Sequence, residues 1–536
     1  MPPLGRSGAR AARGRARPPS WRRPRAHRQH RTGLDRAPSQ GPPLPHRQRA
    51  RDPLDGERPS RPRATTNRAA PLLPADPARH RLGVRSVNVT VVGAGYVGAI
   101  SATVLAYLGD RITCVESDPV RLAAWRSGTD PLREPGLGDM LRRVDVRFVP
   151  HADFADADAI LVAVGTPMGR DGRPDLEQVE TAAAQIGARA RPGAVVLMRS
   201  TVPVGTCDRL QSGPLHAQRV VSNPEFLREG HALRDAFFPD RIIAGGPADA
   251  RATVAELYGR IIDRYGLPRD LSADNGSSGP VPFRWMSATS AELAKYAANG
   301  FLATKLSFAN EIANLAQAVG ADASAVLGSM GLDPRIGSQF LRPGLGWGGS
   351  CFPKDTRALQ AIGDGMGYDF LVLKAAIEQN ARQLRGFAAA IERELPQGAT
   401  VGLLGLAFKA GTADTRESPA IALARLLLRA GLAVNAYDPA VREVAGDLKI
   451  RVHSTAAEAC DAADAVVIAT EWPEFAAIDL GAVRRLTRGD LLFDGRSVIA
   501  PAAAAAAGFR YAGPAGFSER SIEMTAVQRL RLGTAA

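Results

Sequence analysis

The stretch that decides the fold is residues 87–98, VNVTVVGAGYVG, an apolar run followed at once by three glycines in a GxGxxG spacing. Residues 87–92 predict a buried strand, and residues 99–108 predict a helix. The next predicted strand, residues 112–115, ends at Glu116, an acid that lies 23 positions beyond the first glycine. Strand, glycine turn, helix, strand and acid in this order are the fingerprint of a dinucleotide-binding Rossmann unit.

Each glycine of the fingerprint has a physical reason. Gly93 permits the tight turn, Gly95 lets a pyrophosphate approach the backbone, and Gly98 lets the helix pack closely on the sheet. The helix N-terminus supplies free N–H groups for the phosphates. Glu116 would accept a hydrogen bond from a ribose 2′-hydroxyl and repel a 2′-phosphate, which favours NAD over NADP. An ordinary strand-to-helix turn is the alternative interpretation.

Strands and helices alternate again further along the chain. The predicted strands at 159–164 and 194–198 are followed by Thr166 and Thr201, whose hydroxyls would face a cofactor, since ligands lie beyond the carboxyl ends of parallel strands. Ordinary turn chemistry explains each threonine equally well. Residues 288–320 predict one long helix, and its predicted apolar face carries Leu293, Tyr296, Ala297, Phe301, Leu302 and Phe308.

A second strand and glycine turn begin at residue 401, after helices that continue to about residue 395. The expected fold is therefore α/β, with two doubly wound Rossmann-like domains joined by a long central helix and a helical middle domain. The predicted segments are an N-terminal tail at 1–85, a first Rossmann domain at 86–287, the helical domain at 288–396, a second Rossmann-like domain at 397–515 and a C-terminal tail at 516–536.

The net charge of +14 is concentrated in the N-terminal tail. Residues 1–85 hold 21 Arg and five acidic residues, and the other 451 residues carry a net charge of −2. This tail has no apolar periodicity, so we expect it to be disordered. A nucleic-acid-binding arm and a targeting peptide are alternatives, and its Pro and Arg content favours a tail without a role.

Several classes of protein are disfavoured by the rest of the chain. No apolar run reaches 18 residues, so we expect no membrane span. The four cysteines are widely spaced and have no neighbouring His, so we expect neither a metal site nor a disulfide framework. We expect a cytoplasmic protein with no nucleic-acid partner and no membrane partner.

Residues 342–355, RPGLGWGGSCFPKD, place four glycines in six positions shortly before Cys351. Such a loop indicates that something approaches its backbone closely. A thiolate at Cys351 would be stabilised by a nearby lysine and by loop N–H groups, which is how a cysteine nucleophile is activated. A buried structural cysteine is the alternative, and the flanking Lys354 and Asp355 favour the nucleophile. A cysteine hydrolase lacks a convincing histidine partner and leaves the Gly93 turn without a role.

Lysine is rare in this chain, with 6 Lys against 62 Arg, so a lysine inside a motif suggests a need for a compact donor with a tunable pKa. Lys295 and Asn299 share one face of the central helix and could hold an oxyanion, or they could be a solvated pair. Glu225 and Glu229 follow a short predicted strand and could activate water, or they could belong to a solvated helix start. Basic groups that could bind a diphosphate lie at turns: Arg335, Arg342, Lys409, Arg416 and Arg496.

Together these segments resemble the UDP-glucose/GDP-mannose dehydrogenase family over about residues 86–510. The shared segments are GAGYVG, GTP, STVPVG, NPEFLREG, the KYxxN helix, GWGGSCFPKD, FKxGTxDxRES and FDGR. The resemblance implies an NAD-binding first domain, a helical middle domain that forms a homodimer interface, and a C-terminal domain that binds a nucleotide sugar. The implied reaction oxidises a sugar C6 alcohol to a carboxylate with two NAD and one water.

The resemblance also implies residue roles. Cys351 resembles the nucleophile that forms a thiohemiacetal and then a thioester. Lys295 and Asn299 resemble the pair that steadies the C6 oxygen and a water, Asp355 and Glu225 the carboxylates of proton transfer and hydrolysis, and Thr201 the hydroxyl beside that water. The implied NAD contacts are Gly93, Gly95, Tyr96, Val97, Gly98, Glu116, Arg121, Thr166, Thr201, Glu229, Lys354 and Arg416.

The implied nucleotide-sugar contacts are Glu225, Phe226, Leu227, Arg228, Lys295, Asn299, Phe340, Leu341, Arg342, Pro343, Gly344, Gly348, Lys409 and Arg496. Arg335 resembles an arginine that reaches into the neighbouring subunit's site. The segment Ser350-Cys351-Phe352 resembles the members that act on UDP-glucose, whereas GDP-mannose members tend to have Leu after the cysteine and N-acetylhexosamine members a His before it. UDP-glucose is therefore the expected substrate, with GDP-mannose and UDP-N-acetylhexosamines as alternatives.

Overall fold

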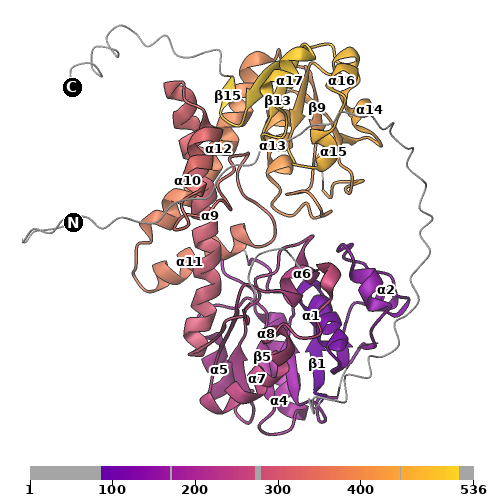
Figure 1. Ribbon diagram of the computed structural model, residues 1–536, viewed down its shortest axis with the longest axis vertical. Helices are drawn as coiled ribbons and strands as arrows, with labels where there is room; N and C mark the ends of the chain where they lie inside the picture. The colour runs from indigo at the N-terminus through magenta and orange to yellow at the C-terminus, as the bar shows by residue number, and fades with distance from the viewer. Residues whose placement is uncertain (1–85, 152, 170–171, 272–278, 447, 518–536) are drawn as a thin grey trace, which may run out of the picture. The chain divides into compact units, whose positions relative to one another are not determined.

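The computed structural model describes residues 86–151, 153–169, 172–271, 279–446 and 448–517. The predicted tail at 1–85 and residues 518–536 of the predicted C-terminal tail lie outside the described residues. Figure 1 gives the arrangement of the elements.

An eight-stranded sheet forms the first α/β unit, in the order β3-β2-β1-β4-β5-β6-β7-β8. Neighbouring strands are parallel except β6 and β7, which are antiparallel. The strands are β1 (Asn88–Val92), β2 (Arg111–Val115), β3 (Val146–Val149), β4 (Ala159–Val162), β5 (Val195–Met198), β6 (Arg219–Ser222), β7 (Ile242–Gly245) and β8 (Phe283–Met286). The helices are α1 (Tyr96–Tyr107), α2 (Pro119–Arg126), α3 (Leu137–Leu141), α4 (Glu177–Arg189), α5 (Thr206–Ser212), α6 (Ala232–Phe237), α7 (Arg251–Leu257) and α8 (Gly259–Ile262).

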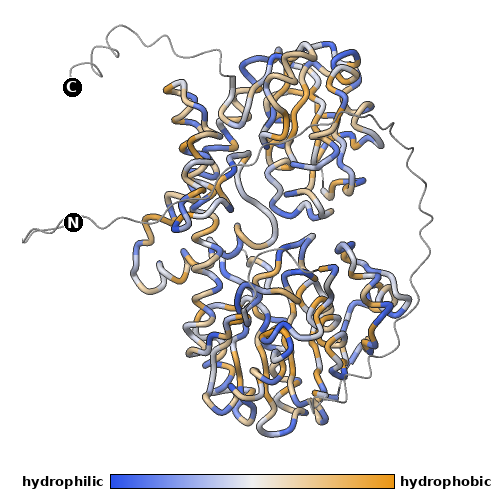
Figure 2. The backbone as a smooth tube through the Cα atoms, viewed as in Figure 1, coloured by the Kyte–Doolittle hydropathy of each residue, from blue (hydrophilic) through white to orange (hydrophobic). Residues whose placement is uncertain are grey.

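The inner strands of this sheet are apolar on both faces. Every residue of β4 and β5 is buried, and the side chains of the two sheet faces belong to two separate apolar clusters. Figure 2 shows the hydrophobic residues concentrated along the strands. This pattern is typical of parallel strands that helices cover on both sides.

Four helices follow the first sheet: α9 (Ala288–Val319), α10 (Ala323–Gly331), α11 (Phe352–Gly365) and α12 (Leu371–Glu394). Helix α9 packs on α11 and α12, and it also contacts β6, β7 and α5 of the first sheet. The predicted apolar face of this helix is only partly buried in the chain. Tyr296 is fully buried, whereas Leu293, Phe301 and Phe308 are 44%, 66% and 46% exposed, because the helix buries a face of small and polar residues instead.

The second sheet has seven strands in the order β11-β10-β9-β12-β13-β14-β15, and only its β14 and β15 pair is antiparallel. The strands are β9 (Thr400–Leu404), β10 (Ala433–Tyr437), β11 (Arg451–Val452), β12 (Ala465–Ile468), β13 (Leu491–Asp494), β14 (Arg510–Gly513) and β15 (Gly516–Phe517). The helices are α13 (Pro419–Arg429), α14 (Ala456–Cys460), α15 (Pro473–Ala476), α16 (Leu480–Leu486) and α17 (Pro501–Ala506).

The predicted fold class is confirmed: two doubly wound parallel sheets are joined by a helical middle region. Element boundaries differ by a few residues. Helix α1 begins at Tyr96, three positions before the predicted start, because Gly95 already acts as its N-cap. Among the described residues, no helix combines the length and the apolar character needed to cross a membrane.

Candidate active site

The glycine turn after β1 has the shape that a dinucleotide needs. Gly93 has φ +97°, in the left-handed region, and a Cβ added to Gly98 would lie 1.8 Å from the Gly93 carbonyl oxygen. A Cβ added to Gly95 would meet no described atom within 4 Å. Gly95 caps α1 without a side chain, so the N–H groups of the first helical turn point toward open space. The turn fits a bound pyrophosphate.

Glu116 lies where the fingerprint requires an acid, at the end of β2, and it is 2% exposed. Its carboxylate accepts two hydrogen bonds from Arg121, at 3.1 and 3.0 Å, and one from the Asp118 N–H at 2.8 Å. The two predicted cofactor residues are therefore joined to each other. Thr166 is also close to its predicted neighbour, since its hydroxyl donates to the Thr201 carbonyl oxygen at 3.0 Å.

One cavity of about 710 Å³ brings together residues from segments far apart in the sequence. Its walls include the loop after β6, α9, the loop that leads into α11 and the loop after β9, with further residues from α1, α6 and α8. The predicted site residues that line it are Glu225, Phe226, Leu227, Arg228, Glu229, Lys295, Asn299, Phe340, Gly348, Cys351 and Lys409.

A buried ion pair lies in the wall of this cavity. The Lys295 ammonium donates to the Glu225 carbonyl oxygen at 2.7 Å and to its Oε1 at 3.0 Å. Burial lowers the pKa of Lys295, but the negatively charged groups around it, Glu225 above all, outweigh burial, so the net shift of this pKa is upward. Burial raises the pKa of Glu225, but the Lys295 charge and the hydrogen bond from the Leu227 N–H outweigh burial, so the net shift of this pKa is downward. Both groups are thus charged at neutral pH.

Asn299 and Asp355 form a second buried pair one helical turn along α9. The Asn299 amide donates to Asp355 Oδ2 at 2.6 Å, and the Lys354 ammonium donates to Asp355 Oδ1 at 2.6 Å. Asp355 is 1% exposed and lies in the first turn of α11, where the helix dipole favours a carboxylate. The interpretation of Lys295 and Asn299 as a solvated pair is wrong, since both side chains are buried.

Cys351 is the N-cap of α11, and its side chain is open to the cavity. The protein around it still displaces enough water for burial to raise the pKa of the thiol. The charge of Lys295 opposes this rise, and the negative charges of Glu225 and Asp355 add to it. The expected lysine is present, since the charge of Lys295 favours the thiolate, but burial and the two carboxylates leave the pKa of the thiol above its ordinary value.

The glycine-rich loop before Cys351 is approached closely, but by this chain itself. A Cβ on Gly348 would lie 2.1 Å from the Glu417 carbonyl oxygen, and one on Gly349 would lie 2.7 Å from the Phe408 ring. A Cβ on Gly344 would lie 3.1 Å from the Gly495 carbonyl oxygen. Three of the four glycines thus let the loop pack against the second α/β unit.

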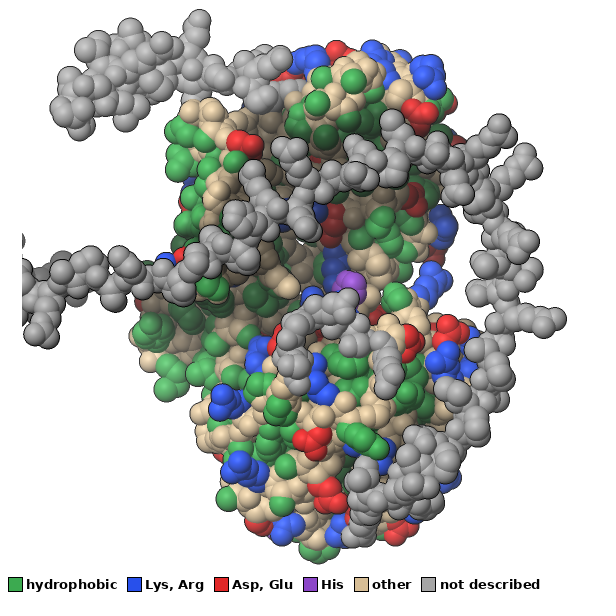
Figure 3. Space-filling model, viewed as in Figure 1, with side chains coloured by type: hydrophobic (Ala, Val, Ile, Leu, Met, Phe, Trp, Pro, Cys, Tyr) green, Lys and Arg blue, Asp and Glu red, His purple; other side chains and the backbone are tan. Residues whose placement is uncertain are grey.

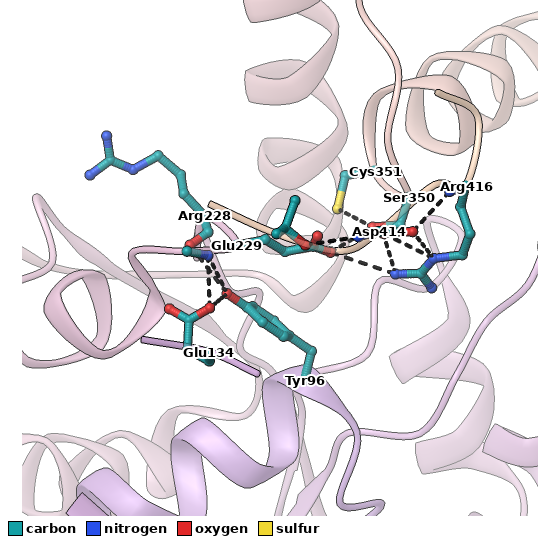
Figure 4. Close-up of polar contacts among 10 residues, drawn as sticks. Tyr96, Glu134, Arg228, Glu229, Ser350, Cys351, Asp414 and Arg416 are labelled. Carbon is teal, nitrogen blue, oxygen red and sulfur yellow. Dashed lines mark hydrogen bonds and ion pairs between the residues drawn. The ribbon is translucent and has the colours of Figure 1, made fainter. Parts of the chain in front are cut away.

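Figure 4 shows how the loop after β6 is tied to the dinucleotide turn and to Cys351. The buried Glu134 carboxylate accepts hydrogen bonds from the Tyr96 hydroxyl at 2.6 Å, from the Gly230 N–H at 2.7 Å and from the Ala232 N–H at 2.6 Å. Next to this junction, Glu229 accepts from the Ser350 hydroxyl at 3.1 Å. The cofactor turn and the thiol are therefore connected through a few side chains.

The remaining predicted residues lie outside the cavity wall. Arg416 pairs with Asp414 and lies 3.6 Å from Glu229, and Arg342 donates to the Ser497 carbonyl oxygen at 2.6 Å. Arg496 bonds the carbonyl oxygens of Ala469 and Phe408 within its own sheet unit. Leu341, Pro343 and Gly344 belong to the loop against that unit. Arg335 is not brought to the cavity, since its side chain is 87% exposed and bonded to Asp333.

Three acidic residues of the site were not predicted as site residues from the sequence. They are Glu134, described above, Asp414, which holds Arg416, and Glu292 on α9. Glu292 is 3% exposed and accepts from the Gly205 N–H at 2.6 Å and the Cys207 N–H at 2.8 Å, so it anchors the loop that carries Thr201. A signal existed for Glu292, because it precedes Lys295 by three positions and so shares its helix face.

An oxidoreductase that uses a dinucleotide is the class that the open glycine turn and the adjoining cavity define. Comparison with known proteins specifies it further. Residues 87–262, 289–382 and 402–501 match, respectively, the NAD binding domain, the central domain and the UDP binding domain of the UDP-glucose/GDP-mannose dehydrogenase family. The chain belongs to this family, and NAD is its cofactor.

Curated relatives agree over nearly their whole length. The UDP-glucose 6-dehydrogenase of Pseudomonas aeruginosa is 40% identical over 454 residues, which cover 80% of this chain and 97% of the relative. UDP-glucose 6-dehydrogenase YwqF of Bacillus subtilis is 38% identical, with 79% and 97% covered. Among solved structures, a UDP-glucose dehydrogenase from Pyrobaculum islandicum has a TM-score of 0.72 and 36% identity, covering 81% of this chain and 99% of that one.

Proposed function

We propose that the protein oxidises the C6 hydroxyl of UDP-glucose to the carboxylate of UDP-glucuronate, with NAD as acceptor and Cys351 as a covalent nucleophile. The observation that carries the proposal is the convergence of the Cys351 thiol, the Lys295 and Glu225 pair and the Asn299 and Asp355 pair at one cavity. Bound NAD would accept a hydride in each of the two oxidations. The relatives named above act on UDP-glucose, which favours this substrate.

The chain's own groups can carry the remaining chemistry. The Cys351 sulfur would add to the C6 aldehyde, and the buried Lys295 ammonium would stabilise the oxyanion that forms. The fixed Asn299 and Asp355 pair would orient the water that hydrolyses the thioester, with Glu225 as the carboxylate available for its proton. Holding the intermediate covalently keeps the aldehyde in the cavity between the two oxidations.

The three matched segments suggest a division of labour. Residues 86–287 would hold NAD, residues 288–396 would supply the thiol, and residues 397–515 would hold the nucleotide through Lys409 and Arg496. The Lys409 ammonium lies in the cavity wall, where burial lowers its pKa. A diphosphate would reverse that shift, because an adjacent anion favours the charged form.

A cytoplasmic homodimer is the assembly we propose. Leu293, Phe308, Leu315 and Leu332 are exposed large apolar side chains on and after α9. Figure 3 shows hydrophobic side chains gathered on the surface over the central helices. Arg335 follows Leu332 by three positions. If a partner subunit docks on this surface, the Arg335 side chain could extend into the partner's active site. Phe308→Glu should convert the dimer to a monomer in sedimentation velocity, and a dimer that persists would contradict this assembly.

The decisive experiment follows the absorbance of NADH when the full chain is mixed with NAD and a sugar nucleotide. UDP-glucose should yield about two NADH per sugar, since the reaction removes four electrons. Cys351→Ala should abolish turnover and still bind NAD, whereas Cys460→Ala, at a buried thiol of the second sheet unit, should keep turnover. GDP-mannose and UDP-N-acetylglucosamine complete the panel. The proposal fails if none of the sugar nucleotides yields NADH.

A further inference from the structure

A chain of three side chains leads away from the thiol of Cys351. Its Sγ lies 3.6 Å from the Ser350 Oγ, and the Ser350 hydroxyl donates to Glu229 Oε1 at 3.1 Å. Figure 4 shows the three groups together, with Arg416 and Asp414 beyond Glu229. Ser350 and Glu229 come from different segments, the loop before α11 and the loop after β6, so the fold brings this chain together.

The hydrogen bonds in this chain have a direction. A carboxylate can only accept, so the single proton of the Ser350 hydroxyl points to Glu229. The Ser350 oxygen is then left to accept, and the Cys351 thiol is its donor. The order is S–H to O–H to carboxylate, which is the arrangement needed to move a proton from sulfur to Glu229.

Charges around the two ends favour this transfer. The pKa of Glu229 is raised, because burial and the neighbouring Asp414 disfavour its charged form. Arg416, Lys409 and the Ser350 hydroxyl favour the charged form and offset part of this rise. At the thiol end, Lys295 on α9 lies opposite Glu225 and Asp355, and these charges together with burial leave the thiol pKa raised. A carboxylate with a raised pKa is a stronger base, so it is better suited to receive a proton from a thiol whose own pKa is raised.

We propose that Ser350 relays the thiol proton of Cys351 to Glu229 when the sulfur attacks. The electron pair of the S–H bond forms the S–C bond, and the π pair of the aldehyde moves onto its oxygen. The thiol proton passes to the Ser350 oxygen while the Ser350 hydroxyl proton passes to Glu229, which becomes neutral. Ser350 ends unchanged, and the negative charge has moved from Glu229 to the substrate oxygen, where the Lys295 ammonium can stabilise it.

This relay builds on the proposed covalent role of Cys351, but its test needs neither NAD nor substrate. The full-length protein is alkylated with iodoacetamide between about pH 5 and about pH 10, and the modification of Cys351 is followed by peptide mass spectrometry. The other three cysteines are buried. In the wild type the rate should depend on two ionisations, with an acid-side shoulder that reports Glu229 as the base.

Two variants separate a relay from a purely electrostatic effect. Ser350→Ala and Glu229→Gln should each slow alkylation near pH 7 by about tenfold and remove the acid-side shoulder, leaving the titration of the thiol alone. Removing a negative charge near the thiol would, by electrostatics alone, lower the thiol pKa and speed up the reaction. Slower alkylation of Glu229→Gln therefore supports the relay, and an unchanged or faster rate overturns it.

Further variants guard against misfolding and chance agreement. The double variant should be no slower than either single variant, because both break one path. Ser350→Thr keeps a hydroxyl and should retain the shoulder. Ser454→Ala and Glu443→Gln, at exposed positions of the second sheet unit, serve as matched controls. If alkylation of Glu229→Gln is not slowed while the wild type still forms NADH from UDP-glucose, the relay is wrong and the proposed function still holds.

Discussion

The two sheets share a topology, and both fix their first strand in the same way. Asp158 accepts the Asn88 N–H of β1 at 3.1 Å, and Asp464 accepts the Thr400 N–H of β9 at 2.8 Å. Each of these aspartates is paired with an arginine, Arg191 in the first unit and Arg488 in the second, in both cases at 2.9 Å. The sheets also carry an acid directly after their second strand.

That acid is used differently in the two units. In the first, Glu116 is bonded to Arg121, and the turn after β1 stays open at Gly95. In the second, Asp438 accepts the N–H groups of Leu406 and Ala407 at 2.8 and 3.0 Å. The turn donors that would meet a phosphate are thus already satisfied.

The second turn also lacks an open position after its first glycine. Gly405 and Gly93 are alike, since each has a positive φ and an added Cβ would lie within 3 Å of a neighbour, Thr470 and the Ala163 carbonyl oxygen respectively. The next two residues, Leu406 and Ala407, are fully buried. Two Rossmann-like turns with the same strand order therefore differ in two ways: Asp438 occupies the N–H groups of the second turn, and the residues after its first glycine are buried. The first turn is open to a dinucleotide and the second is not. A nucleotide at the second unit has to bind beyond this turn, where Lys409 and Arg496 lie.

The largest expected effect breaks the open turn. Gly98→Ala places a Cβ 1.8 Å from the Gly93 carbonyl oxygen, so the turn must distort and NAD affinity should fall by at least about a hundredfold, or about 2.7 kcal/mol. Gly95→Ala is the informative partner, because its Cβ meets no described atom within 4 Å. Gly95→Ala should melt at the wild-type temperature but bind NAD more weakly than the wild type. Calorimetric titration measures the NAD affinity of both variants, and thermal melts measure their stability. Tight NAD binding by Gly95→Ala would contradict the assignment of the open space at Gly95 to the pyrophosphate.

A change of similar size in the second unit should leave NAD untouched. Asp438→Ala removes the acceptor of the Trp472 indole N–H, at 3.1 Å, and of four backbone N–H groups, those of Leu406, Ala407, Ala440 and Val441. The free energy of unfolding should fall by about 3 kcal/mol, since unsatisfied buried donors cost about 1–3 kcal/mol each and partly find water. Urea unfolding followed by circular dichroism measures this loss, and NAD titration of the folded variant is the control. Weakened NAD binding would show that the two turns are coupled.

Much of this comparison was accessible from sequence. The succession of strands and helices along the chain, both glycine turns and the long helix follow from apolar runs and glycine spacing, which local chemistry controls. Eleven residues of the cavity wall followed from motif and resemblance, whereas others in the same wall, such as Arg241 and Tyr258, were not predicted. What could not be predicted depends on partners far away in the chain: Asp438 closing its own turn, Glu292 holding the Thr201 loop, and the glycines near Cys351 packing on Glu417 and Phe408.

Two further features show what a sequence does not reveal. Lys354 is adjacent to Cys351 in the sequence, yet its ammonium donates to Asp355, and the charge that favours the thiolate is that of Lys295 on α9. Helix α9 carries Phe301 and Phe308 on its predicted apolar face, yet both side chains are exposed. In each case the composition of a segment is visible in the sequence, but the group that faces it is not.

A smaller effect would sharpen the role of the acid after β2. Glu116→Ala removes the carboxylate and frees the Arg121 guanidinium, which is 49% exposed, to meet a 2′-phosphate. The ratio of NADP to NAD affinity should rise by about tenfold, or about 1.4 kcal/mol. Competitive titration of the two dinucleotides measures this ratio. Glu116→Ala with Arg121→Ala should lose the gain, and an unchanged ratio in Glu116→Ala would mean that Glu116 does not read the ribose.

The smallest expected effect concerns the residue before the second strand, where the first unit has Asp110 and the second has the buried Leu432. Burial raises the pKa of Asp110 to about 6, although it accepts the Val87 N–H at 3.1 Å. A carboxyl whose pKa is higher in the folded state stabilises the fold below its unfolded pKa, and this stabilisation is lost as the pH rises from about 4 to about 6. At neutral pH the ionised Asp110 therefore opposes folding. Asp110→Asn should raise the free energy of unfolding by about 1–2 kcal/mol near pH 7.5, and the gain should vanish near pH 4. Urea unfolding at both pH values measures the difference, and a gain that persists at the lower pH would assign it to packing rather than to charge.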